Sequence, residues 1–260
     1  MLRMPSFKVH HPKTPAEAVN MHAELDGARY IAGGTDILPN LKHGLLDPGH
    51  LISLKGVDAL RGVQLDEDGS TWVGSGTTLH ELATHPLLKD KLPGLAGAAA
   101  SVAGPQHRRM GTVGGNIMLD TRCLYFNQTP QWRHALGYCL KAEGTWCHVI
   151  GSKATCVAAN SADTVPMFLA LGTNLELMTV DGPQSLNLAD LYHQNGMANH
   201  TVDPSALVTG LRISAQPVGH RSTYRKVRSR DAIDFRSWVW RSWPTSTKTC
   251  VHIWPPPSTQ

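Results

Sequence analysis

Two glycine pairs, each at a turn between regular elements, constrain the fold of this chain more than any other feature. The first lies in Ala32-Gly33-Gly34-Thr35-Asp36 and the second in Gly111-Thr112-Val113-Gly114-Gly115-Asn116. Glycine permits positive φ and lets backbone N–H groups approach a phosphate closely. Neither pair matches the Gly-x-Gly-x-x-Gly fingerprint, and each alone is most simply a turn or a strand-end bulge. Together, about eighty residues apart, they predict two cradles for one long anionic cofactor.

Strand-like and helix-like segments alternate along most of the chain. Thr14-Pro15-Ala16-Glu17 combines a capping threonine, a proline at the first helical position and a glutamate at capping-box spacing. The same reasoning predicts strands over 6–9, 29–32, 51–54, 71–76, 174–178 and 184–188, and helices over 14–25, 36–42, from 78, 92–102 and 165–171. This order predicts an α/β or α+β fold, with 174–178 and 184–188 as paired strands.

Composition excludes several classes of protein. The chain has 260 residues, 41% of them hydrophobic and 17% charged, which is typical of a globular protein of about two domains. No secretory signal or membrane-spanning run is apparent, so we expect a cytoplasmic location and no membrane partner. Eight of the Lys and Arg residues lie in 221–260, which leaves the body near neutral, and no nucleic-acid-binding motif accompanies them.

Four of the five cysteines, Cys123, Cys139, Cys147 and Cys156, lie within one 34-residue window. In a reducing compartment, clustered cysteines more often bind metal or act in redox chemistry than form disulfides. Their gaps of fifteen, seven and eight residues contain no Cys-x-x-Cys. Spacing alone therefore leaves open an iron–sulfur cluster, a structural zinc ion or unrelated buried cysteines. His148 could substitute for a cysteine as a metal ligand, but it is more simply a residue beside the ligands or on the surface.

Four motifs in one order carry a resemblance to a known family. Ala32-Gly33-Gly34-Thr35-Asp36, residues 108–116, Ser161–Pro166 and Tyr224–Arg228 resemble segments of the FAD-binding medium subunits of molybdenum hydroxylases, which include carbon-monoxide and xanthine dehydrogenases. The resemblance covers about residues 1–235. It implies that the two glycine turns hold the FAD pyrophosphate, that Asp163 binds the adenosine side and that Lys226 lies near the flavin. The FAD-binding residues it implies are Tyr30, Ile31, Ala32, Gly33, Gly34, Thr35, Asp36, Val102, Gly111, Thr112, Val113, Gly114, Gly115, Asn116, Asp163 and Lys226.

The cysteine window resembles an insert found in one group of that family. Residues 122–128 and 147–151 are similar to the β subunits of 4-hydroxybenzoyl-CoA reductases, which carry about forty extra residues at this point. This resemblance implies a [4Fe–4S] cluster bound by the four cysteines. Nearby aromatic residues would shield it from water: Tyr125, Phe126, Trp132, Tyr138 and Trp146.

The resemblance also predicts the domain organisation. It implies an α+β, two-part FAD-binding domain of the PCMH type: a small α/β subdomain over 1–57, a larger subdomain over 58–180 with the insert at 120–158, and the start of a C-terminal α+β domain over 181–235. Residues 236–260 hold four of the seven tryptophans and Cys250, and show neither strand nor helix period. We interpret them as a truncated or out-of-frame end, the alternative being a proline-rich interaction tail.

The function implied is electron transfer, with no catalytic residue on this chain. Ferredoxin would reduce the [4Fe–4S] cluster, and electrons would pass through FAD to a [2Fe–2S] small subunit and a molybdenum-cofactor large subunit, in a heterohexamer of two copies of three subunits. There 4-hydroxybenzoyl-CoA would be reduced to benzoyl-CoA in anaerobic aromatic degradation. One alternative is the FAD subunit of an oxidising molybdenum hydroxylase, and another is a zinc-stapled structural protein without flavin.

Overall fold

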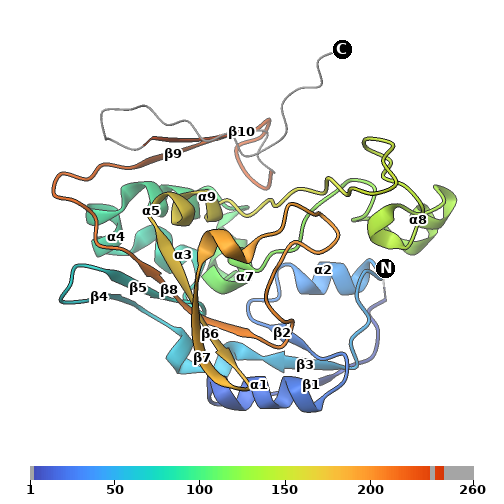
Figure 1. Cartoon of the computed structure of the whole chain (residues 1–260), viewed down its shortest axis with the longest axis horizontal. Coiled ribbons are helices and arrows are strands. Elements are labelled where there is room, and N and C mark those ends of the chain that lie inside the picture. Colours follow the sequence, from blue (N-terminus) through green and yellow to red (C-terminus); the bar gives the residue numbers. More distant parts are fainter. Residues whose placement is uncertain (1–2, 235–237, 243–260) are drawn as a thin grey trace.

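The structure of the chain is a computed structural model that describes residues 3–234 and 238–242 (Figure 1). The helices are α1 (Pro15–Glu24), α2 (Ile37–Lys42), α3 (Leu79–Thr84), α4 (Pro86–Lys91), α5 (Pro93–Ala100), α6 (Pro105–Met110), α7 (Val113–Ile117), α8 (Pro130–Ala135) and α9 (Val165–Ala170). The strands are β1 (Lys8–His10), β2 (Arg29–Ile31), β3 (His50–Ser53), β4 (Val63–Leu65), β5 (Thr71–Gly74), β6 (Thr173–Thr179), β7 (Gly182–Asn187), β8 (Leu207–Ile213), β9 (Thr223–Val227) and β10 (Trp238–Ser242).

The N-terminal part is a small three-stranded sheet in the order β1-β3-β2, and both of its pairings are parallel. Parallel neighbours need crossover connections, and α1 and α2 supply them. The predicted cap of α1 is confirmed, because Thr14 Oγ1 accepts a hydrogen bond from the Glu17 N–H at 3.1 Å. Strand β2 of this sheet ends directly before the first glycine turn.

The larger sheet is antiparallel and has the order β4-β5-β8-β6-β7. The predicted pairing of the strands around 174–178 and 184–188 is confirmed by the register of β6 on β7. The domain boundary expected at residue 181 falls between these two hydrogen-bonded strands, so the sheet does not divide there. Strand β8, which sequence periodicity does not predict, lies at the centre of this sheet.

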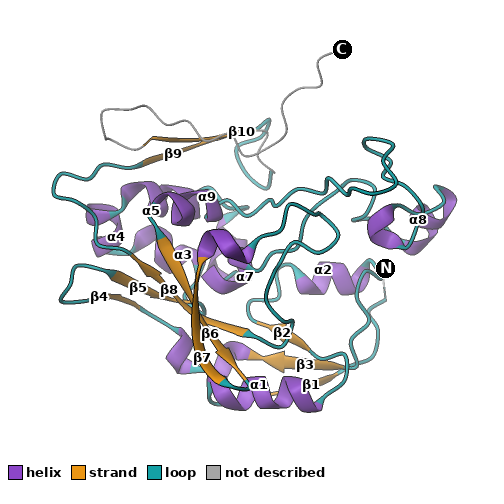
Figure 2. Ribbon diagram, in the orientation of Figure 1, coloured by secondary structure: helices purple, strands orange, loops and turns teal. Residues whose placement is uncertain are grey.

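Two apolar cores hold the elements together. The main core lies between the large sheet and the helices that cover one of its faces, including α3, α5 and α9 (Figure 2). Its fully buried members include Phe168 on α9 and Leu95 on α5, which confirms that both segments are buried helices. The second core joins the two sheets: Val19 on α1 and Ile52 on β3 pack with Leu207 at the start of β8.

The last described strand, β10, pairs in antiparallel fashion with β9, with Trp240 opposite Arg225. The segment 238–242 thus forms a strand although its sequence shows no strand period. The other residues of the 236–260 tail, Cys250 among them, lie outside the described residues. Within the described residues, none of the helices is both long and apolar enough to span a bilayer.

Replacing the core phenylalanine tests this packing. Phe168→Ala removes a fully buried aromatic side chain and should lower the free energy of unfolding by about 3–5 kcal/mol, through lost transfer energy and a residual cavity. Urea unfolding measures the change. Val218→Ala, at a fully exposed position, is the control and should stay within about 0.5 kcal/mol of the parent.

Candidate cofactor site and cysteine cavity

The two glycine turns pack directly against each other. A Cβ added to Gly33 would lie 2.5 Å from the carbonyl carbon of Met110 and closer still to its oxygen, so only glycine fits. A Cβ on Gly111 would lie 3.3 Å from Thr35 Oγ1. The turn after β2 and the turn before α7, about eighty residues apart in sequence, therefore meet backbone to backbone, as the two-cradle interpretation requires.

The first turn presents unused hydrogen-bond donors. Within the part of the chain that the structure describes, the N–H groups of residues 32–36 donate to no protein acceptor. Gly34 adopts a φ of +74°, a left-handed conformation that favours glycine, and Thr35 is exposed. Successive unpaired N–H groups at a turn form an anion-binding concavity, so this turn fits a pyrophosphate.

The donors of the second turn are used within the protein. The Gly114 N–H donates to Ser75 O at 2.7 Å, and the Gly115 N–H donates to Thr112 Oγ1 at 3.2 Å. Thr112 is thus the N-cap of α7 rather than a free ligand. The second turn supports the first from behind, and the two are not equivalent cradles.

A buried polar group adjoins the second turn. Asn116 Oδ1 accepts a hydrogen bond from Thr164 Oγ1 at 2.6 Å. The preceding residue, Asp163, pairs with Lys226 Nζ at 2.7 Å, and Tyr224 OH donates to Asp163 at 3.1 Å. The side chains of Asp163 and Lys226 are only 6% and 4% exposed. The resemblance places these two residues near different ends of FAD, whereas here their side chains meet.

The end of α5 belongs to the same region. Lys226 Nζ also donates to Ser101 O at 3.4 Å, and Arg108 Nη1 donates to Val102 O at 2.7 Å. Tyr30 differs from the other predicted residues, because its hydroxyl donates to Ser205 O at 2.6 Å and burial raises its pKa. Only the backbone of Tyr30 therefore faces the first turn.

The cysteine-bearing insert is a closed loop tied to that turn. Arg122 and Ala159 form an antiparallel bridge at its base, with backbone hydrogen bonds of 2.8 and 3.0 Å. The Arg122 guanidinium pairs with Asp36, the last residue of the first glycine turn, and burial lowers the pKa of Arg122. At its far side, Arg133 of α8 donates to Gly44 O at 2.9 Å. No local pattern in the sequence predicts this role of Arg122, because its partner lies eighty-six residues away.

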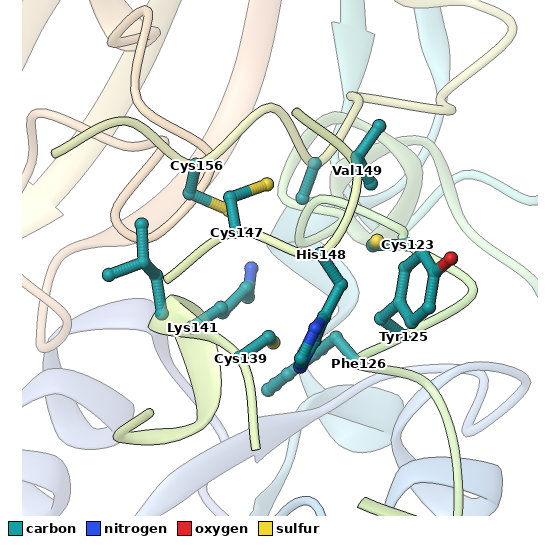
Figure 3. A pocket seen from close by; sticks show the side chains of 11 residues that line it. Cys123, Tyr125, Phe126, Cys139, Lys141, Cys147, His148, Val149 and Cys156 are labelled. Atoms are coloured by element: carbon teal, nitrogen blue, oxygen red, sulfur yellow. The ribbon is translucent and has the colours of Figure 1, made fainter. Parts of the chain in front are cut away.

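All four predicted cysteines line one cavity inside the insert (Figure 3). Cys139, Cys147 and Cys156 are buried, Cys123 is half-buried, and all four are free thiols. Residues from two turns, a 3-10 segment and an extended stretch bring them together, although their spacing follows no ferredoxin or zinc pattern.

Backbone N–H groups lie at two of the four sulfurs. Burial of the Cys147 thiol opposes its ionisation, yet hydrogen bonds from the N–H groups of Ile150, Val149 and Val157 lower its pKa overall. Burial raises the pKa of Cys156, partly offset by the Ala158 N–H. Such N–H···S contacts stabilise thiolate ligands and help to set the reduction potential of iron–sulfur clusters.

The predicted aromatic shield is only partly present. Tyr125 and Phe126 line the cavity, but Trp132, Tyr138 and Trp146 are 37%, 37% and 49% exposed. His148 also lines the cavity, with its Nε2 2.7 Å from Tyr138 O.

The four thiols are a donor set of a kind that metal sites use. Across residues 3–234 and 238–242, no group of three or more His, Cys, Asp or Glu side chains is arranged to hold a single metal ion. Four thiolates are one of the ligand sets of structural zinc sites. Four thiols around one cavity are by ligand type the set used by [4Fe–4S] clusters, whose ligands bind separate irons.

Comparisons with known proteins identify the family. Residues 5–215 match the family described as the FAD-binding domain in molybdopterin dehydrogenase. The chain belongs to this family. It is therefore an FAD-binding subunit of the molybdenum hydroxylase type, with a PCMH-type fold.

Two relatives illustrate the range of the family. The chain is 32% identical over 242 residues to the aldehyde oxidoreductase FAD-binding subunit of Escherichia coli K12, covering 89% of this chain and 75% of the relative. It is 28% identical over 226 residues to the carbon monoxide dehydrogenase medium chain of Afipia carboxidovorans, covering 86% and 64%. The chain thus spans less than two thirds of the second relative.

Solved structures share the fold. Carbon monoxide dehydrogenase from Oligotropha carboxidovorans superposes with a TM-score of 0.73 at 27% identity, over 96% of this chain and 73% of that one. Quinoline 2-oxidoreductase from Pseudomonas putida 86 gives 0.73 at 19% identity, over 96% and 72%, which shows a common fold.

The packing of the two glycine turns predicts the effect of a single methyl group. Gly33→Ala forces the turns apart and should lower both the FAD content of the purified protein and its stability, the latter by about 1–3 kcal/mol. Flavin absorbance per protein and thermal unfolding measure the two effects. Gly49→Ala, where an added Cβ meets nothing within 4 Å, is the matched control and should retain full FAD.

The buried Asp163–Lys226 pair predicts a second pattern. Asp163→Asn leaves the Lys226 ammonium buried without its counter-charge and should cost about 3 kcal/mol of stability. In the double variant, Asp163→Asn with Lys226→Met, part of that stability should return. The FAD content that depends on the pair should not return. Lys91→Met, at an exposed pair with Asp90, should change stability by less than about 1 kcal/mol.

Proposed function

We propose that this chain is a flavin and iron–sulfur electron-transfer subunit, which holds FAD on the glycine turns and a [4Fe–4S] cluster on Cys123, Cys139, Cys147 and Cys156. When bound, the two groups would supply electron transfer between a ferredoxin and partner subunits carrying [2Fe–2S] and molybdenum cofactors. The chain itself binds, orients and shields these groups, and substrate chemistry belongs to a partner.

The observation that carries this proposal is the shared cavity. Four thiols from a 34-residue window line one space, and the loop that holds them is anchored by Arg122 to Asp36 of the first glycine turn. A purely structural loop has no need of four convergent free thiols, two of which, Cys147 and Cys156, have N–H donors at their sulfurs.

For the substrate, we propose 4-hydroxybenzoyl-CoA, reduced to benzoyl-CoA by a heterohexamer of two copies of three subunits. The support is the similarity of residues 122–128 and 147–151 to the β subunits of 4-hydroxybenzoyl-CoA reductases. The arrangement of the insert next to the first glycine turn suits an additional entry point for electrons.

A second candidate is the FAD subunit of an oxidising molybdenum hydroxylase. The observation that favours it is the match to an aldehyde oxidoreductase subunit. This match covers 242 residues, more than the part of the chain that precedes the insert. In this case electrons would flow outward from the molybdenum partner through FAD, and this chain would carry no cluster.

Cysteine substitution tests the cluster. The subunits are co-expressed and purified without oxygen, and iron, acid-labile sulfide and flavin are counted. Cys139→Ser should lose about four irons per chain while FAD is retained. Unchanged iron content would contradict the cluster, and zinc without iron or flavin would contradict the whole proposal. Cys250→Ser, outside the described residues, is the matched control and should keep its iron.

Substrate assays of the same complex separate the two candidates. Reduction of 4-hydroxybenzoyl-CoA with a low-potential donor supports the reductase. Oxidation of aldehydes or carbon monoxide with an electron acceptor, without dehydroxylation, supports the oxidising enzyme.

A further inference from the structure

A lysine side chain reaches into the space between the cysteines. Lys141 lines the cavity together with all four thiols, and its ammonium nitrogen points among them (Figure 3). The side chain is only 5% exposed. Burying an ammonium group costs free energy unless the charge is paired, so Lys141 needs hydrogen-bonding partners at this position.

Three hydrogen-bond acceptors hold the Lys141 ammonium in place. Lys141 Nζ donates to Asp120 Oδ1 at 2.6 Å, to Gly196 O at 2.9 Å and to Thr121 Oγ1. It also lies 5.0 Å from the centre of the Phe126 ring, within cation–π range. The ammonium is therefore a charge at a defined place.

The two members of the Lys141–Asp120 pair differ in their contact with water. The Asp120 side chain is 53% exposed, against 5% for Lys141. Solvent screens the carboxylate more strongly than the ammonium, so the cavity experiences a net positive potential. The anchor at Gly196 also ties the insert to the loop after β7, since the Gly196 N–H donates to Cys156 O at 3.0 Å.

We propose that Lys141 is a positioning and tuning residue, whose fixed positive charge raises the reduction potential of the iron–sulfur cluster held by the four cysteines. The inference rests on the proposed function. Each reduction adds one electron, taken from the ferredoxin-type donor, to a cavity that already carries four thiolate charges. A buried cation beside that cavity stabilises the reduced form more than the oxidised form.

The experiment measures the midpoint potential of the cluster in the anaerobically purified complex by redox titration followed by electron paramagnetic resonance. Lys141→Gln should lower the equilibrium constant for one-electron reduction about tenfold, a shift of about 59 mV to lower potential. Lys141→Arg keeps the charge and should restore most of the potential. Lys153→Gln removes the same charge from an exposed position of the insert and should leave the potential unchanged.

A change at the counter-ion separates charge from structure. Asp120→Asn removes the acidic partner and should move the potential in the opposite direction to Lys141→Gln, by a smaller amount because Asp120 is half exposed. A merely structural role would shift both variants the same way, or neither, and would overturn the proposal. This variant also decides the matter if Lys141→Gln fails to assemble.

Failure of the inference and failure of the proposed function give different results. A parent complex without iron contradicts the cluster itself. A parent with about four irons per chain, whose potential is the same in Lys141→Gln and Lys153→Gln, contradicts only the role of Lys141.

Discussion

An added side-chain carbon at Gly33 would lie 2.5 Å from the Met110 carbonyl carbon, and this absence of space organises the cofactor site. Because the two turns pack backbone against backbone, the small parallel sheet is held against the helices of the larger subdomain. The unpaired N–H groups of residues 32–36 then remain available to an anion, while the second turn spends its own donors on internal hydrogen bonds. The first turn is thus available for binding, and the second supports it.

The cysteine cavity depends on the same turn. Asp36 ends the turn and pairs with Arg122, which closes the base of the insert against Ala159. From this base the chain makes a loop that returns four thiols to one space and anchors Lys141 beside them. A displacement of the glycine turns would therefore reach both proposed redox sites, which is a physical reason to treat them as one unit.

Local sequence signals predicted much of the fold. The capping residues of α1 and the small apolar run of α5 act within a few positions, and the structure confirms these helices. Strand β8 was missed because Gly210 interrupts its pattern. The reason is tertiary, since the Trp72 indole covers Gly210 and an added Cβ would lie 2.7 Å from Trp72 Cε2. Glycine has a low intrinsic strand propensity, and the packing of a β5 side chain over Gly210 stabilises the strand instead.

The sequence by itself determined the two glycine turns, their order and the identity of the four cysteines, because these depend on residue type and on resemblance to a family. Only the tertiary structure decided that the turns touch, that their donors are used differently, and that Asp163 meets Lys226. It also brought Lys141 to the thiols and Arg122 to Asp36. Such pairings are made by chain segments distant in sequence, and their energies come from burial and charge that no local window contains.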